Sequence, residues 1–229
     1  MTALSPNALL KIPTLRTKFC SLRHGQSLAN LSKIISSDPA ISTKEHGLSD
    51  LGKDQASNAG VSLSEQLSKS KIATTRTQGM AIFSSDFKRA RETAEIVAEK
   101  IKENGINLYK DNVILESRLR ERNFGELNGG PDTRYKDVWE KDVLDPTHTE
   151  FDVESVNDVV KRTTSLVLEL DDELNKDDAN DVDWLCVLVA HGDVLQILQT
   201  GFEKMDGSLH RTLPHLETAT PRNLFLKLD

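Results

Sequence analysis

Cysteine, aromatic residues and long apolar runs are all scarce in this chain of 229 residues. Two cysteines, Cys20 and Cys186, are too few for a disulfide framework, and both lie in apolar segments, so we expect buried free thiols in a reducing compartment. No apolar run approaches the roughly 20 residues that span a bilayer. The 36 acidic residues outnumber the 29 basic ones, and the formal charge of −7 excludes the global basic field of a non-specific nucleic-acid binder. We therefore expect a cytoplasmic protein that has neither a membrane nor a nucleic acid as its partner.

The first sixteen residues differ in charge from the rest of the chain. They contain two basic residues, Lys11 and Arg16, several hydroxyl side chains and no acidic residue, a composition that faintly resembles a transit peptide. They lack the long apolar stretch of a secretion signal. We interpret residues 1–16 as a frayed N-terminal tail, with a remnant targeting segment as the alternative, and residues 17–229 as a single domain.

Short apolar runs alternate with segments of helical periodicity along the rest of the chain. Strands are predicted at 19–22, 80–83, 113–115, 184–190 and, at an edge, 224–228. Helices are predicted at 49–70, 86–103, 156–174 and 194–202, and an acidic turn at 177–183. This alternation predicts an α/β fold, a three-layer α/β/α sandwich in which helices cover both faces of a mostly parallel open sheet. Residues 123–151 are expected to be mostly loop, with a short helix near 135–141.

Polar residues of related chemistry follow three of the predicted strands. Arg23 and His24 follow the first, Arg89 comes shortly after the second, and His191 and Gly192 follow the most apolar one. In open parallel sheets, ligands bind beyond the carboxyl ends of the strands. Two histidines and two arginines are therefore expected at the same edge. Each histidine is followed by a glycine, which lets the backbone approach a ligand closely.

These residue types suit phosphoryl transfer through a phosphohistidine. A neutral imidazole nitrogen is a competent nucleophile, and the arginines disfavour protonation of His24. Arginine forks match phosphate oxygens, and His191 can donate a further hydrogen bond to them. Because cationic side chains can supply the charge that Mg²⁺ supplies elsewhere, we expect no metal and no other cofactor. Singly, these features have plainer explanations, since Ser85, for example, is typical of a helix cap; it is their combination that favours a site.

Several motifs carry a resemblance to a known family. They are R-H-G-x-S-x-x-N at 23–30, L-S-x-x-G-x-x-Q-A at 48–56, S-D-x-x-R-A-x-x-T-A at 85–94, L-R-E-R-x-F-G at 119–125 and V-x-H-G at 189–192. From about residue 18 to residue 228, the chain resembles the histidine phosphatase superfamily, which has the phosphoglycerate-mutase-like fold. The motifs occur in the order of the family.

The resemblance implies a role for each motif residue. It implies that His24 is the nucleophile that becomes phosphorylated and that Glu121 donates the proton to the leaving oxygen. The substrate-binding residues that it implies are Arg23, Ser27, Asn30, Arg89, His191 and Gly192. Chemistry also supports Glu121, because loss of an alkoxide needs a general acid and a carboxyl beside an anionic substrate has a raised pKa. Its neighbours Arg120 and Arg122 either bind substrate anions or pair with Glu121 and other acids.

Two further patterns do not support a site. Residues 47–53 match the first seven positions of a P-loop, but Asp54 follows in place of a hydroxyl residue and no buried strand precedes the segment. The remaining histidines form no spaced metal-binding pair with a cysteine or a carboxylate, so no metal site is predicted; they are His46, His148, His210 and His215. His215 precedes the last strand, where the family often places residues of the pocket rim.

The spacing of the motifs favours a phosphatase over a mutase. Mutases of this family carry a long insert with paired arginines between the acid and the second histidine, whereas only about seventy residues separate Glu121 from His191, with no Arg-Arg pair. Asp193 stands where mutases usually have asparagine, and an acidic residue disfavours a second phosphate. We therefore expect a metal-independent phosphomonoesterase that acts on a small phosphorylated metabolite. The alternatives are a 2,3-bisphosphoglycerate-dependent phosphoglycerate mutase and a non-catalytic binding or regulatory protein on the same fold.

Substrate selection is expected in the region 123–151. Its basic and aromatic side chains suit a lid over a small phosphorylated metabolite, with an ordinary structural loop as the alternative; they are Arg134, Tyr135, Lys136, Trp139 and Lys141. The predicted helices show no surplus apolar stripe, so no oligomeric interface is predicted.

Overall fold

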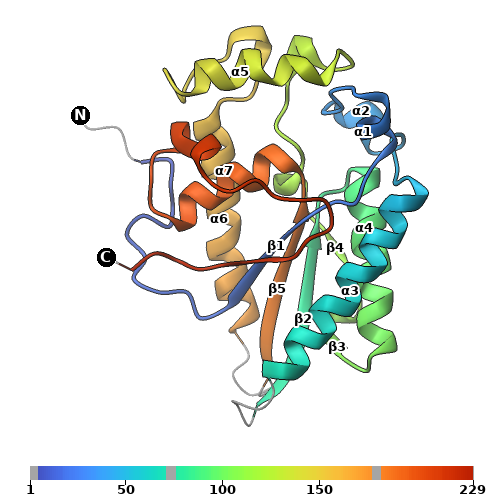
Figure 1. The fold of residues 1–229 in the computed structure, drawn as a ribbon. Coiled ribbons are helices and arrows are strands. Elements are labelled where there is room, and N and C mark those ends of the chain that lie inside the picture. Colours follow the sequence, from blue (N-terminus) through green and yellow to red (C-terminus); the bar gives the residue numbers. More distant parts are fainter. Residues whose placement is uncertain (1–4, 71–75, 177–181, 229) are drawn as a thin grey trace.

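A six-stranded sheet forms the middle layer of the computed structural model, which describes residues 5–70, 76–176 and 182–228 (Figure 1). Its strands are β1 (Lys18–Arg23), β2 (Thr77–Ser84), β3 (Asn107–Leu108), β4 (Ile114–Leu115), β5 (Val182–Ala190) and β6 (Arg222–Leu224). They lie in the order β3-β2-β5-β1-β6, and β4 also pairs with β2. Strands β1 to β5 pair in parallel, and β6 runs antiparallel to β1. The predicted mostly parallel open sheet is confirmed.

Helices cover both faces of the sheet, as the alternating pattern predicts (Figure 1). The helices of one face are α3 (Asp50–Ser70) and α4 (Lys88–Glu103), and those of the other are α6 (Val156–Leu174) and α7 (Gly192–Phe202). Cys20 packs in the core beneath α3 and α4, and Cys186 packs in the core beneath α6 and α7. Both cysteines are therefore buried free thiols, as expected.

Local sequence explains where these helices begin and end. Ser155 caps α6 because its side chain accepts a hydrogen bond from the backbone N–H of Asp158. Helix α4 ends at Glu103, and Gly105 follows with a φ of 68°, a conformation that favours glycine. In the ranges that the structure describes, no helix has both the length and the apolar content to cross a membrane.

Strand β5 lies in the middle of the sheet because its sequence is apolar on both sides. Its residues from Leu185 to Ala190 are all buried, between β1 and β2. A strand that is covered on both faces shows no polar alternation. Arg23 pairs with Ala190 and Ser84 pairs with Val189, so the residues that follow these three strands emerge at one edge.

The last strand is shorter and begins earlier than the sequence predicts. Strand β6 covers only three residues, and 225–228 form no strand. Phe225 and Leu228 are 77% and 75% exposed, and Leu226 packs on the core. The backbone N–H of Lys227 donates to the carbonyl oxygen of Phe202 in α7 at 2.9 Å, so the segment is held by a helix and does not extend the strand. Strand β3 was not predicted because two residues show no periodicity. Most of the predicted acidic turn, 177–181, lies outside the described residues.

Residues 5–16 pack onto the domain, where the sequence analysis expects a frayed tail. Leu9 is fully buried in the core beneath α6 and α7. The side-chain amide of Asn7 donates to the carbonyl oxygen of Gly201 at 3.1 Å, and the N–H of Ala8 donates to Oγ1 of Thr164 at 3.0 Å. One anchoring leucine gives no periodic signal, which is why the composition of the segment did not indicate this packing.

A group of short helices lies beyond the carboxyl edge of the sheet. Helix α5 (Tyr135–Asp142) is close to the predicted 135–141, and α1 (Leu28–Ser32) and α2 (Pro39–Ser42) lie on the same side of the molecule (Figure 1). The apolar cluster that packs beneath α5 consists of Ile35, Phe124, Leu127, Val138 and Val153. This group of helices therefore faces the edge where the predicted site residues emerge.

Candidate active site

His24 stands directly after β1, and both nitrogens of its ring form hydrogen bonds. Nδ1 lies 2.7 Å from the carbonyl oxygen of Gly25, which can only accept, so Nδ1 carries the proton. Nε2 accepts a hydrogen bond from Nε of Arg89 at 3.1 Å. In the neutral ring, the free lone pair is therefore on Nε2, which is the nitrogen that can act as a nucleophile.

The surroundings of His24 keep its ring neutral. The side chain is buried, with 3% of the residue exposed. Burial, followed by the positive charges of Arg89 and Arg23, lowers the pKa of His24 well below its usual range. The lone pair on Nε2 is thus available at neutral pH, as the sequence analysis expects.

Close backbone contacts hold the loop after β1 and explain several motif residues. A Cβ on Gly25 would lie 2.4 Å from the carbonyl oxygen of Gly52, at the start of α3. Thr93 of α4 accepts from the N–H of Gly25 at 3.1 Å, and Gln55 of α3 accepts from the N–H of Gln26 at 2.8 Å. Gly25 thus allows close packing of two backbones, a requirement that the sequence did not indicate.

Two buried donors beside His24 have no hydrogen-bond partner among the described residues, namely Nε of Arg23 and Nδ1 of His191. The rings of His24 and His191 are 5.1 Å apart. Nε2 of His191 lies 2.9 Å from Oγ of Ser85, and this oxygen already accepts from the N–H of Phe87. With the Ser85 hydroxyl as donor to Nε2, the proton of the neutral ring is on Nδ1, which can donate to an anion.

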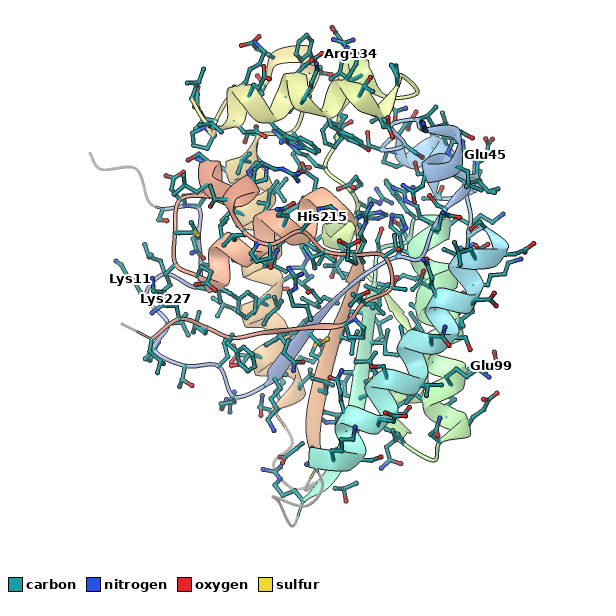
Figure 2. The ribbon with its side chains drawn as sticks, in the orientation of Figure 1. Lys11, Glu45, Glu99, Arg134, His215 and Lys227 are labelled. Atoms are coloured by element: carbon teal, nitrogen blue, oxygen red, sulfur yellow. The ribbon has the colours of Figure 1, made fainter. Side chains whose placement is uncertain are left out.

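Arg23 and Arg89 are held by groups other than carboxylates. Nη1 of Arg23 donates to Nε2 of His215 at 2.9 Å and to the carbonyl oxygen of Leu216 at 3.0 Å, and Figure 2 shows His215 at this edge of the sheet. Nη2 of Arg89 donates to the carbonyl oxygen of Ser36 at 2.8 Å, a contact the sequence did not indicate. Burial lowers the pKa of Arg89 to about 10, so it stays charged at pH 7. Both charges are available to an anion.

Glu121 faces the same space from beside the N-terminus of α7. Its Oε1 accepts from the backbone N–H of Arg122 at 3.0 Å and of Val194 at 3.3 Å. Burial, followed by the negative charge of Asp193, raises the pKa of Glu121 to about 7. The carboxyl therefore exchanges a proton near neutral pH, which is what a general acid requires.

Asp193 belongs to a buried network that ties α5 to α7. Its Oδ1 accepts from the indole N–H of Trp139 at 2.9 Å, and its Oδ2 lies 3.5 Å from Nη1 of Arg122. Arg122 is fully buried and donates twice to Asp142, at 2.7 and 2.8 Å. Trp139 and Asp193 lie 54 positions apart, so no local pattern predicts their contact. The network holds a negative charge beside Glu121.

Asp193→Asn should lower the pKa of Glu121 from about 7 toward the ordinary carboxyl range. The substitution removes the negative charge that disfavours ionisation of Glu121, while an amide oxygen can still accept from Trp139. NMR titration of the labelled carboxyl carbon measures the pKa. Asp137→Asn, which alters a carboxylate paired with Arg134 instead, should leave it unchanged. An unaltered pKa in Asp193→Asn would contradict this electrostatic account.

Arg120 and Arg122 pair with acidic residues and lie outside the lining of the cavity. Arg120 donates twice to Asp86, at 2.7 and 2.5 Å, as Arg122 does to Asp142. Of the explanations left open by the sequence, pairing with other acids holds for both arginines.

Arg122→Met should lower the free energy of unfolding by about 3 kcal/mol, because it leaves the buried Asp142 carboxylate without its guanidinium partner. Urea unfolding measures the loss. Arg118→Met removes partly exposed pairs with Glu116 and Glu169 and should cost no more than about 1 kcal/mol. Adding Asp142→Leu to Arg122→Met should recover part of the loss, because it removes the unpaired carboxylate but also the hydrogen-bond partner of His148. Equal costs for the two single arginine variants would show that burial of the pair has no effect.

The predicted site residues converge on one cavity of about 240 Å³ at the carboxyl edge of the sheet. Seven of them line it, namely Arg23, His24, Ser27, Asn30, Arg89, Glu121 and Gly192, and His191 packs against His24. Ser27 and Asn30 also cap α1, each accepting from the backbone of the other. Tyr135 and Trp139 line the cavity from the expected lid. Ser36, Asp132 and Arg211 also line it, and no pattern in the sequence indicates them. Within the described ranges, no cluster of three or more His, Cys, Asp or Glu side chains could hold a metal ion.

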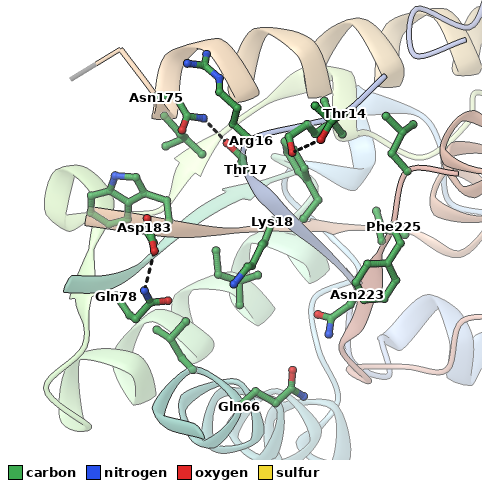
Figure 3. Close-up of a pocket in the computed structure, with 18 of the residues that line it drawn as sticks. Thr14, Arg16, Thr17, Lys18, Gln66, Gln78, Asn175, Asp183, Asn223 and Phe225 are labelled. Carbon is green, nitrogen blue, oxygen red and sulfur yellow. Dashed lines mark hydrogen bonds between the residues drawn. The ribbon is translucent and has the colours of Figure 1, made fainter. Parts of the chain in front are cut away.

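A larger hollow of about 910 Å³ lies at the opposite edge of the sheet (Figure 3). Lys18 extends into it from the start of β1, with Gln66 of α3 below and Phe225 beside it. Its described lining contains no histidine or cysteine, so it offers no nucleophile of the kind found in the smaller cavity, and the carboxylate of Asp183 in it accepts a hydrogen bond from Gln78. The chemistry favours the smaller cavity as the active site.

Comparison with known proteins identifies the family. The model of the histidine phosphatase superfamily (branch 1) matches residues 19–223. The 2,3-bisphosphoglycerate-dependent phosphoglycerate mutase of Methylorubrum extorquens is 25% identical over 213 residues, which cover 90% of this chain and 87% of the relative. The corresponding mutase of Nitrobacter hamburgensis is 29% identical over 192 residues, 80% of each chain.

Solved structures share the fold. A mycobacterial glucosyl-3-phosphoglycerate phosphatase superimposes with a TM-score of 0.67 at 24% identity, covering 90% of both chains. A putative alpha-ribazole-5'-P phosphatase from Escherichia coli gives a TM-score of 0.56 at 17% identity, covering 93% of this chain and 95% of that one. The family match includes every motif at the edge of the sheet, and the chain therefore belongs to branch 1 of the histidine phosphatase superfamily.

Proposed function

We propose that this protein is a metal-independent phosphomonoesterase that hydrolyses a small phosphorylated metabolite through a phosphohistidine at His24. The observation that carries the proposal is the state of His24. Its Nδ1–H is fixed on Gly25, its Nε2 accepts from Nε of Arg89 at the cavity that both side chains line, and its pKa is held well below the usual range. An imidazole of this kind is a nucleophile at neutral pH.

The first step forms the phosphohistidine. The Nε2 lone pair of His24 attacks phosphorus, the P–O ester bond breaks, and its electron pair leaves with the ester oxygen. Glu121, whose pKa of about 7 leaves it partly protonated at neutral pH, gives that oxygen its proton. Because Nε of Arg89 donates to Nε2 in the free protein, it must turn to a phosphoryl oxygen as the substrate binds.

The second step releases phosphate. Water attacks phosphorus, the Glu121 carboxylate takes its proton, and the N–P bond breaks so that the electron pair returns to Nε2. Phosphoryl oxygens in both steps would be bound by Arg89 and by the two donors without partners, Nε of Arg23 and Nδ1 of His191. These cationic and neutral donors supply the charge stabilisation for which other phosphoryl-transfer enzymes use Mg²⁺.

The remaining predicted residues would position the substrate. Ser27, Asn30 and Gly192 line the cavity close to this centre. The cavity of about 240 Å³ lies below the range of about 300–1,000 Å³ that drug-sized ligands occupy, which supports a small substrate. Trp139 and Tyr135 stack at 5.4 Å and form an aromatic wall on the lid side.

Phosphoglycerate mutase activity is the second candidate, and the two mutase relatives favour it. A mutase must hold a bisphosphate and return the phosphoryl group to a different oxygen. Asp132 and Asp193 both line the cavity, and their negative charges disfavour a second phosphate there. Hydrolysis is therefore the first candidate.

The test is a panel of sugar phosphates, phosphoglycerates, phosphoserine and nucleotides in excess EDTA. Release of phosphate is compared with conversion of 3-phosphoglycerate to 2-phosphoglycerate, with and without 2,3-bisphosphoglycerate. EDTA-resistant hydrolysis that exceeds isomerisation supports the phosphatase. Isomerisation well above hydrolysis would replace it with the mutase, and inactivity in both assays would overturn both in favour of a binding role.

A further inference from the structure

Arg211 is a cation of the active-site cavity that the proposed phosphoryl transfer does not use. It belongs to the 3₁₀ helix Gly207–Thr212 and lines the cavity together with Arg23 and Arg89. Among the described residues, no carboxylate forms an ion pair with it, whereas many other arginines of this chain have one. A positive charge in the cavity without an acidic partner indicates an anion that arrives with the substrate.

The guanidinium of Arg211 is held on its face and at one corner. Its Cζ lies 3.8 Å from the centroid of the Trp139 ring, and Nη1 donates to Oε1 of Gln196 at 2.6 Å. Gln196 is itself buried and fixed, because its Nε2 donates to the carbonyl oxygen of Leu213 at 2.9 Å. Trp139 is fixed by its hydrogen bond to Asp193. The guanidinium is therefore preorganised before any ligand binds.

The edge of Arg211 formed by Nε and Nη2 donates to none of the described residues. Through these two nitrogens, an arginine can donate two parallel hydrogen bonds to the two oxygens of a carboxylate. Arg120 shows that geometry in the same molecule, since its Nε and Nη2 donate to the two carboxylate oxygens of Asp86. A carboxylate in the cavity can form the same pair with Arg211.

We propose that Arg211 binds a carboxylate on the leaving group of the substrate, an inference that rests on the proposed phosphatase function. Arg23 and Arg89 hold the phosphoryl group beside the nucleophile, so the third arginine is left for the part of the substrate that departs. A carboxylate suits it better than a second phosphate, because two oxygens match the two donors and because Asp132 and Asp193 repel a dianion more strongly. The substrate class is thus a phosphate ester of a small hydroxy acid.

The test compares two esters that differ at one carbon. 3-Phosphoglycerate carries a carboxylate where racemic glycerol 3-phosphate has a hydroxymethyl group. Wild type should prefer 3-phosphoglycerate, and Arg211→Gln should lower kcat/KM for it by about 10- to 100-fold, as expected for lost hydrogen bonds between charged groups. For glycerol 3-phosphate, the same variant should lose less than about 3-fold. Arg211→Lys keeps the charge without the fork and should restore part of the preference.

Arg91→Gln is the matched control. It removes an arginine that pairs with Glu95 on the partly exposed side of α4, outside the cavity lining. It should change kcat/KM for neither ester. Equal losses on both esters in Arg211→Gln, or no preference in wild type, would overturn the role of Arg211.

Two further measurements separate this proposal from the proposed function. Calorimetric binding of both esters to His24→Ala reports the carboxylate preference whether or not turnover occurs, and p-nitrophenyl phosphate reports phosphoryl transfer to a substrate without a carboxylate. Turnover of p-nitrophenyl phosphate without any carboxylate preference overturns only the role of Arg211. A carboxylate preference in binding that Arg211→Gln abolishes, in a wild type that hydrolyses no ester, supports the role of Arg211 and overturns only the hydrolysis.

Discussion

His24→Ala should lower kcat/KM by at least about 10⁴-fold for every phosphate ester that the protein hydrolyses, because it removes the atom to which the phosphoryl group is transferred. His191 is unsuited to replace it. Its Nε2 is hydrogen-bonded to Ser85, and with the Ser85 hydroxyl as the donor its Nδ1 carries the proton. The loss should therefore exceed that caused by removing any single group that only binds the phosphoryl oxygens.

Trapping of the intermediate identifies the cause of the loss. After rapid quenching with ³²P-labelled substrate, wild type should carry a label that is labile in acid and stable in base, as a phosphohistidine is, and His24→Ala should carry none. His46→Ala is the control, since His46 bonds to Ser36 but lies outside the lining of the cavity. It should still be labelled and keep turnover within about 10-fold of wild type. A full, acid-labile label on His24→Ala would contradict the assignment of the nucleophile.

The part of the site that sequence reasoning could predict is the part set by strand order. The apolar run of β5 can be covered on both faces only in the middle of a parallel sheet, and this brings the residues after β1, β2 and β5 to one edge. Strand order therefore places Arg23, His24 and His191 at the same edge of the sheet, independently of how the side chains pack. The family motifs add Arg89 and Glu121 at the same place.

The rest depends on contacts between distant segments, which no local pattern encodes. The Trp139 indole donates a hydrogen bond to Asp193, which lies 54 positions away in the sequence. Arg211, from the 3₁₀ helix Gly207–Thr212, stacks on the same indole. In the sequence, Trp139 indicates only a lid and Arg211 belongs to no motif. Gly25 shows a second kind of limit, since a side chain there is excluded by the backbone of Gly52 in α3, which is distant in the sequence.

Glu121→Gln should lower kcat/KM for an alkyl phosphate by about 10³-fold and leave that for p-nitrophenyl phosphate nearly unchanged. Glutamine keeps the shape of the side chain and can still accept from the N–H groups of Arg122 and Val194, but it has no acidic proton. An alkoxide needs that proton to leave, whereas p-nitrophenolate is stable enough to leave without it. Because kcat/KM covers the steps up to loss of the leaving group, the comparison isolates proton donation to that group.

Two further readouts tell donation from mere positioning. Glu121 acts in its protonated form and its pKa is about 7, so kcat/KM of wild type for the alkyl ester should fall as the pH rises through 7. The pH profile of Glu121→Gln should lack this fall. The variant should also release a burst of p-nitrophenol and then slow down, because hydrolysis of the phosphohistidine has lost the carboxylate that takes the proton from water. Equal losses on the two esters without a burst would mean that Glu121 positions the substrate and donates no proton.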